Sequence, residues 1–264
     1  MQTTGYFLTA ITALLLTSCT NMQTTPSPEV RQTLAPTGKL RVGVYAGSPF
    51  SMIRDPASGE TKGITVEIGK ALATRLGVPY EQVEFPRIAE VLEALKAGKV
   101  DMALANASPA RAKEFAWTPP VLLIELGYLV PPGSKVTTIT DIDRSGIRVG
   151  VTEGGTTNRE LVHALKNATV VPAATLNAAI DMLSQHRIDT YTTNKANLYE
   201  MSDKLPGSRV LDGRWGIEYL SIAIPKGREQ AMAFVSAFVE EAKAEGLVAR
   251  AAQRTGLRGA VDKE

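Results

Sequence analysis

The sequence is poor in the residue types on which several common site chemistries depend. Its 264 residues include one cysteine and two histidines, so the chain can form no internal disulfide, and neither His163 nor His186 has a partner at metal-ligand spacing. The 29 basic and 27 acidic side chains nearly balance, which leaves no broad basic surface for nucleic acid. We therefore expect no metal site, no cofactor and no nucleic-acid partner.

Long apolar runs are also scarce, and the one near the N-terminus, residues 6–16, is too short to span a bilayer. It ends just before Cys19, in a Leu-Thr-Ser-Cys sequence that resembles the cleavage box of bacterial lipoproteins. This pattern predicts a lipoprotein-type signal peptide over residues 1–18 and a lipid anchor on Cys19. An ordinary signal peptide with a chance cysteine is the alternative, and the lack of Lys or Arg before Arg31 counts against a strong signal.

Residues 19–37 contain much Thr, Ser, Pro, Gln and Asn and almost no large apolar side chains. Such a segment cannot bury enough surface to order itself, so it predicts a flexible tether, with the folded part beginning near Gly38. We expect an exported monomer in the periplasm, where only its lipid anchor contacts the membrane.

The rest of the chain alternates between strand and helix patterns, which is typical of α/β folds with a largely parallel sheet. The first stretch predicts strands at 40–44, 80–85 and 100–105 and helices at 64–76 and 88–97. After a break at 118–120, the alternation restarts at Ile147 and predicts strands at 147–151, 169–171 and 188–193 with helices at 158–166, 176–185 and 195–201. A long amphipathic helix is predicted at 229–244.

Two apolar runs, 121–130 and 219–224, interrupt this alternation and read as paired crossovers between two lobes. They predict that residues 38–127 and 222–264 form lobe 1 and that residues 128–221 form lobe 2. Two crossing strands make a hinge, and a cleft between lobes is a preferred place for a small-molecule site.

Two junctions between a strand and a helix are suited to an anion. Ser108 can cap a helix that begins at Pro109, which places Arg111 in the first turn, where the helix dipole disfavours a cation unless an anion is also bound. Residues 149–158 contain glycines that let the backbone approach a guest closely, followed by hydroxyl side chains. Together the junctions predict a carboxylate held between the lobes.

The chain resembles the type 3 extracellular solute-binding proteins, which deliver polar amino acids to ABC transporters. The resemblance covers about residues 38–257 and depends on the order and spacing of several short segments. These are Gly38-Lys-Leu-Arg-Val-Gly-Val44, Gly63-Ile-Thr-Val-Glu67, Leu95-Lys-Ala-Gly-Lys-Val-Asp101, Ser108-Pro-Ala-Arg111, Trp117-Thr-Pro-Pro120, Val149-Gly-Val151 with Gly154 to Thr156, and His186-Arg-Ile-Asp189. It implies a two-lobe periplasmic-binding-protein fold of type II, each lobe a mixed sheet flanked by helices.

The resemblance also implies ligand-binding residues. Arg111 matches the arginine that grips the ligand's carboxylate, which a guanidinium holds with a bidentate fork; the alternative is a surface pair with Glu114. Thr156, helped by backbone N–H groups near Gly155, would donate from the opposite lobe, although this stretch can also serve as a helix cap alone. Asn106 matches a position that lines the same pocket.

Two departures leave the rest of the ligand open. The family has an aspartate for the ligand's ammonium group where this chain has Asn194, and an amide does not neutralise a buried cation. Either the ligand lacks an α-amino group, or Glu153 or Glu125 serves instead; a solvated loop residue is the other reading of Glu153. The position whose side chain often stacks on the ligand is occupied by Ile88.

Tyr45 and Phe50, in the first loop, are the remaining candidates for aromatic walls of the pocket, although each can equally be a core or rim residue.

These observations predict the substrate-binding component of an ABC importer, which closes its hinge around a small amino acid or related carboxylate and presents it to a permease. We expect no enzymatic activity. One alternative is an enzyme, because the Gly-Gly-Thr-x-Asn segment is similar to one in cyclohexadienyl dehydratases, but the acidic residue that those enzymes need is Asn197 here. A sensory ligand-binding protein is a second alternative.

Overall fold

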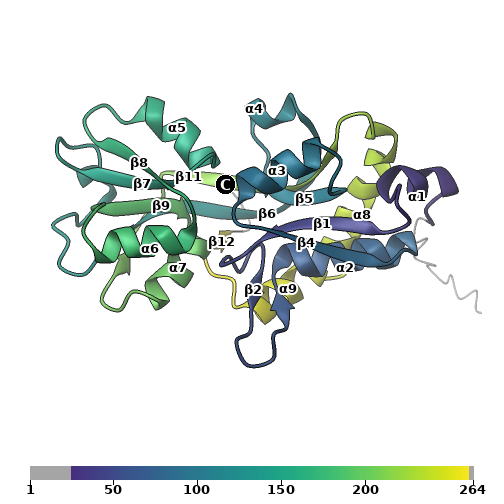
Figure 1. Cartoon of the computed structure of the whole chain (residues 1–264), viewed down its shortest axis with the longest axis horizontal. Coiled ribbons are helices and arrows are strands. Elements are labelled where there is room, and N and C mark those ends of the chain that lie inside the picture. Colours follow the sequence, from purple (N-terminus) through teal and green to yellow (C-terminus); the bar gives the residue numbers. More distant parts are fainter. Residues whose placement is uncertain (1–24, 262–264) are drawn as a thin grey trace, which may run out of the picture.

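The structure is a computed structural model that describes residues 25–261 (Figure 1). The predicted signal peptide and the predicted lipid anchor at Cys19 lie outside the described residues. No helix within the described range is long and apolar enough to cross a membrane.

A sheet of ten strands runs through the molecule, with the spatial order β4-β1-β5-β11-β6-β9-β7-β8 and with β10 and β12 paired to β6. Strands β1, β4 and β5 pair in parallel at one end, and β7, β8 and β9 do so at the other. The strands are β1 Leu40–Tyr45, β4 Tyr80–Phe85, β5 Met102–Asn106, β6 Phe115–Val130, β7 Arg148–Thr152, β8 Thr169–Ala173, β9 Thr190–Asn194, β10 Arg209–Val210, β11 Gly216–Pro225 and β12 Ala260–Val261; β2 Ile53–Arg54 and β3 Thr61–Lys62 form a separate hairpin.

The antiparallel strands β6 and β11 connect the two ends of the sheet. They pair with each other from Phe115 opposite Pro225 to Leu126 opposite Gly216. Toward lobe 1 β11 pairs with β5, and toward lobe 2 β6 pairs with β9 (Figure 1). The predicted architecture of two lobes joined by two crossover strands is confirmed, and the predicted lobe boundaries fall within these strands.

The break predicted at residues 118–120 is wrong, because β6 continues through both prolines. Proline cannot donate to a strand ladder and is tolerated where the pairing is irregular. Here the register shifts on either side of Ser221, which lies opposite Pro120, and the Thr118 hydroxyl accepts the N–H of Ile222 at 3.0 Å. The side chain of Thr118 thus replaces an acceptor that the regular ladder would have supplied.

Helices cover both faces of the sheet. In lobe 1, Met102 and Leu104 of β5 belong to the same core as α2 and α8, whereas the alternate residues Ala103 and Ala105 pack with α3. The helices are α2 Ile64–Leu76, α3 Ile88–Lys96, α4 Pro109–Ala112, α5 Thr156–Ala164, α6 Leu176–Ser184, α7 Lys195–Asp203, α8 Met232–Ala244 and α9 Leu247–Thr255, with short 3-10 turns at Ile139–Asp141 and Glu229–Ala231. Helix α9 was not predicted; it lies between Gly246 and Gly256, both of which have positive φ.

The tether predicted over residues 19–37 is wrong for its second half, because Pro28–Leu34 form helix α1. Ser27 caps this helix by accepting the N–H of Val30, and Pro28 occupies the first turn, where its missing N–H costs nothing. Leu34 is fully buried in the core of lobe 1, and Arg31 Nε donates to the carbonyl of Leu76 at 2.9 Å. The polar composition of this segment therefore gives little signal for a short capped helix that is held by one buried apolar residue, Leu34.

Candidate ligand-binding site

A cavity lies between the two lobes, beside the crossover strand β11. Its walls come from lobe 1, from lobe 2 and from β11, which supplies Glu218 and Leu220. The space that the centre of a water molecule can reach in it is about 50 Å³, several times the roughly 10–15 Å³ that one water needs. The cavity therefore suits a compact ligand.

Seven of the eight ligand-binding residues predicted from the sequence line this cavity, and the eighth, Glu153, does not. The seven are Tyr45, Phe50, Asn106, Arg111, Gly155, Thr156 and Asn194. Residues spread over 150 positions of the chain are thus brought together by the fold, and their roles in binding stay predictions.

Arg111 enters the cavity from the junction between β5 and α4. Ser108 caps α4 by accepting the N–H of Arg111, and Pro109 is its first residue, as the sequence predicted. Only 5% of Arg111 is exposed, and Nη1 donates to the carbonyl of Asn106 at 3.0 Å. Its Nε and Nη2 are buried and have no hydrogen-bond partner among residues 25–261.

Burial lowers the pKa of Arg111 to about 10, which is still far above neutral pH. The guanidinium is therefore a buried cation that keeps two donors for a guest. The alternative surface pair with Glu114 is wrong, because Glu114 pairs with Lys96.

The N-terminus of α5 forms the facing wall in lobe 2. Thr156 is its first residue, and the Thr156 hydroxyl is buried without a hydrogen-bond partner. The first N–H groups of a helix have no partner within the helix, so this end favours an anion. The N–H of Gly155 is not among the free donors, since it donates to the carbonyl of Thr152 at 3.0 Å.

Asn106 acts through its backbone and through the strand beside it. Its carbonyl accepts from Arg111, and its side-chain oxygen accepts the N–H of Tyr219 at 2.9 Å. Asn106 therefore holds both the Arg111 side chain and strand β11 in place.

Asn194 does not offer a free acceptor. Its side-chain oxygen caps α7 by accepting the N–H of Asn197 at 3.1 Å, and its amide nitrogen donates to Oε2 of Glu218 at 2.9 Å. Both ends of the amide are thus used within the protein. The residue that it orients, Glu218, lines the cavity and was missed by the sequence analysis.

Glu218 is an acidic residue on β11 with 8% of its surface exposed. Burial raises the pKa of its carboxyl, while the hydrogen bond from Asn194 and the charge of Arg111 act in the opposite direction. The available signal was a single charge beside the apolar run 219–224, which alternation places on the same face as Leu220. The apolar run itself predicts a crossover strand, which assigns no role to the charged residue next to it.

The two acidic residues suggested for this role lie elsewhere. Glu125 pairs with Lys195 at 2.6 Å and with Arg214, outside the cavity lining. Glu153 pairs with Arg87 of lobe 1 across the cleft. Neither faces the ligand space, because each already neutralises a cation of the protein.

The remaining walls combine apolar and polar side chains. Phe50, Ile88 and Leu176 line the cavity together with Tyr45, and burial raises the pKa of Tyr45 to about 12, so that its hydroxyl stays neutral. The side-chain oxygen of Asn197 is buried without a hydrogen-bond partner. Within residues 25–261 no group of three His, Cys, Asp or Glu side chains is arranged to hold a metal.

Comparison with known proteins identifies a family and its relatives. Residues 40–256 match the family described as bacterial extracellular solute-binding proteins, family 3. A probable histidine-binding protein of Campylobacter jejuni is 28% identical over 251 residues, which cover 91% of this chain and 93% of the relative.

Two solved structures share the fold. A mutant of ArgBP from T. maritima has a TM-score of 0.77 at 22% identity, covering 86% of this chain and 99% of that one. The ancestral amino acid-binding protein AncCDT-1, a precursor of cyclohexadienyl dehydratase, has a TM-score of 0.73 at 23% identity, covering 85% of this chain and 98% of that one. At these identities the likeness shows the fold alone.

Proposed function

Because this chain belongs to family 3 of the bacterial extracellular solute-binding proteins, we propose that the solute it binds is a small amino acid, taken up as the zwitterion. The lobes close around it through the hinge made by β6 and β11.

One observation carries this proposal: the cavity offers donors on α4 and α5 and acceptors on β11 and α7. On α4 and α5, the donors without a partner among residues 25–261 are Nε and Nη2 of Arg111 and the hydroxyl of Thr156, from opposite lobes. The acceptors are the carboxylate of Glu218 and the side-chain oxygen of Asn197. A buried charge without a counterion is costly, so a guest with one carboxylate and one ammonium group satisfies both ends.

Glu218 supports an α-amino group on the ligand despite the asparagine at position 194. In this arrangement the negative charge comes from the crossover strand, and Asn194 orients that carboxylate by its hydrogen bond. The cation is then neutralised by Glu218, which an amide by itself would not do.

The proposal extends to the protein's partners and location. A relative named as a probable histidine-binding protein and the family assignment support a receptor that presents its ligand to an ABC permease. We propose an exported, periplasmic monomer tethered through Cys19, which the lipoprotein-like cleavage sequence supports.

The test is a thermal-shift screen of L-amino acids against their matching α-hydroxy acids, followed by calorimetry on the ligands that raise the melting temperature. A ligand at a hundred times its dissociation constant stabilises by about 2.7 kcal/mol. We expect an amino acid to bind and its hydroxy acid to fail. Arg111→Ala and Glu218→Gln should each weaken binding about 10- to 150-fold, since hydrogen bonds to charged groups contribute about 1.5–3 kcal/mol.

Lys113→Ala is the matched control, because it removes an exposed cation two residues from Arg111. Unchanged affinity in Arg111→Ala would contradict the carboxylate anchor. Equal binding of the amino and hydroxy acids would contradict the role of Glu218.

A dehydratase-like enzyme is the second candidate, and one observation favours it. Glu218 is a buried carboxyl with a raised pKa inside the cavity, which is the kind of group that serves as a general acid. We propose binding without catalysis, because the acidic residue that those dehydratases need is Asn197 here, and an amide does not serve as a general acid. Incubation with prephenate or arogenate, followed by product absorbance, should show no turnover; turnover that Glu218→Gln abolishes would favour the enzyme.

A further inference from the structure

One charged side chain of the cavity has no part in the scheme above. Arg87 precedes α3 in lobe 1 and lines the cavity beside Pro86 and Ile88. Its Nε is buried without a hydrogen-bond partner, and its Nη1 donates to Oε2 of Glu153 in lobe 2 at 2.5 Å. The same guanidinium therefore forms part of the cavity wall and bridges the two lobes.

The lobes touch at this point. Glu153 lies in the turn between β7 and α5, followed by Gly154 with φ +68°. A methyl group at Gly154 would lie 2.9 Å from Cβ of Ala89, which belongs to α3. The backbone of lobe 2 thus reaches α3 next to the ion pair, and the pair closes the cleft at its rim.

The wall beside Arg87 is the part of the cavity left for the ligand's side chain. The carboxylate end lies at Arg111 and Thr156, and the ammonium end lies at Glu218 and Asn197. What remains is the loop before α3 in lobe 1 and the loop before α6 in lobe 2, where Thr175 and Leu176 line the cavity.

We propose that Arg87, held by Glu153 across the cleft, is the specificity-determining residue that limits the size of the ligand's side chain. This inference rests on the proposed function. A short side chain fits beneath the guanidinium and lets the ion pair form as the lobes close. A long side chain displaces the guanidinium, so the pair is lost and the closed state is less stable.

The contact between Arg87 and Glu90 serves as an internal reference for the pair between Arg87 and Glu153. Glu90 lies 3.3 Å from Nε of Arg87, but both residues belong to lobe 1, so their contact persists whether the cleft is open or closed. Neither Glu90 nor Glu153 lines the cavity. Substituting either one leaves every residue of the cavity wall in place, and only the change at Glu153 affects closure.

The experiment measures the affinities of the full chain for glycine, L-alanine, L-leucine and L-phenylalanine by calorimetry. The wild type should prefer glycine or L-alanine. Glu153→Gln should reduce the preference for L-alanine over L-leucine about two- to fivefold, as expected for a partly exposed ion pair. Arg87→Ala should reduce it about tenfold or more, because it also removes the wall, and Glu90→Gln should leave it unchanged.

The salt dependence of the preference for L-alanine over L-leucine distinguishes this role of the Arg87–Glu153 pair from a merely structural one. At about 1 M NaCl, where the Debye length is about 3 Å, the wild type should approach the preference of Glu153→Gln, which itself should respond little. The size limit alone would be overturned if the wild type preferred L-leucine or L-phenylalanine. It would also be overturned if the preference for L-alanine over L-leucine were unchanged in both Glu153→Gln and Arg87→Ala. Failure of all four amino acids to bind would overturn the proposed function as well.

Discussion

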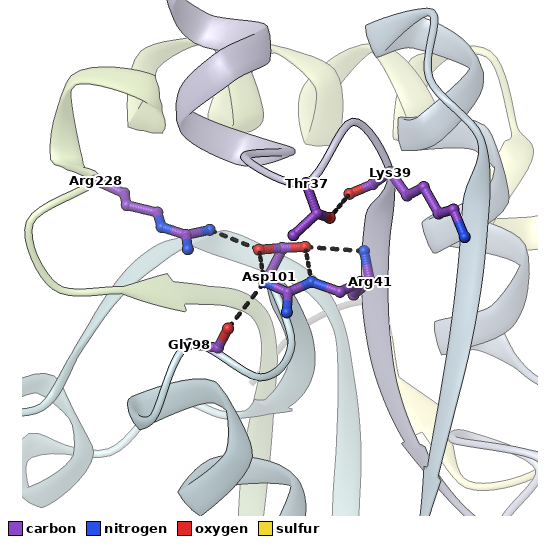
Figure 2. Close-up of polar contacts among 6 residues, drawn as sticks. All are labelled: Thr37, Lys39, Arg41, Gly98, Asp101 and Arg228. Atoms are coloured by element: carbon purple, nitrogen blue, oxygen red, sulfur yellow. Dashed lines mark hydrogen bonds and ion pairs between the residues drawn. The ribbon is translucent and has the colours of Figure 1, made fainter.

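Asp101 is a fully buried carboxylate that two arginines hold in place (Figure 2). Arg41 donates from Nε and Nη2 to its two oxygens at 2.8 Å each, and Arg228 donates to Oδ1 at 2.8 Å. This cluster ties the start of β1 to the residue before β5 and to the segment after β11. Lobe 2 repeats the fork with Arg148 and Asp189, at 2.9 Å for each bond, but the Asp189 side chain is 31% exposed.

The two aspartates make a matched pair for a stability test. Asp101→Asn should lower the free energy of unfolding by about 3–5 kcal/mol, because it removes a fully buried counterion from two partly buried arginines. Asp189→Asn should cost about 1 kcal/mol or less, since water reaches that pair. Chemical denaturation measures both, and equal losses would contradict the role of burial. Neither residue lines the cavity, so ligand affinity is the internal control.

At the scale of elements, α1 shows how one apolar residue can decide whether a segment folds. Seven residues are too few for a stable isolated helix, so α1 depends on its contacts with lobe 1. Leu34 supplies the buried contact, and Gln230 donates to the hydroxyl of Thr33 at 3.2 Å. The folded part of the chain therefore includes Ser27, eleven residues before the predicted start at Gly38.

Leu34→Ala should lower the free energy of unfolding by about 2–5 kcal/mol, the usual cost of a large-to-small change in a core. Gln32→Ala, on the exposed side of the same helix, should change it by less than about 0.5 kcal/mol. A chain that begins at Gly38 should melt at a lower temperature than one that begins at Thr25. If all of these proteins were equally stable, α1 would contribute nothing to the fold.

At the scale of the whole molecule, a small set of chain segments connects the two lobes. The strands β6 and β11 cross between the lobes, and the segment after α9 adds a third contact, since Arg258 lies 4.8 Å from the ring centre of Tyr199 in α7. The strand β12 then pairs with β6 at the hinge. The pair between Arg87 and Glu153 also joins the lobes, at the cavity wall that Arg87 lines.

The sequence by itself determined the α/β class, the two crossovers and the place of Arg111 in the cavity, because each depends on local information. Strand and helix periods, the Ser-Pro-x-Arg cap and the apolar runs all extend over a few neighbouring residues. The same locality explains two errors, since a charged residue next to an apolar run and a short capped helix in a polar segment give weak local signals.

Only the tertiary structure decided which charges meet. Glu218 lies 24 positions from Asn194, and Glu153 lies 66 positions from Arg87. Neither pairing can be recognised from the local sequence pattern, because strand order and the closeness of the lobes determine it. Burial then gives these contacts their importance, since a charge removed from water needs a partner. The placement of Arg111 and Thr156 in the cavity was therefore predictable from the sequence, and the position of Glu218 and the bridge across the cleft required the fold.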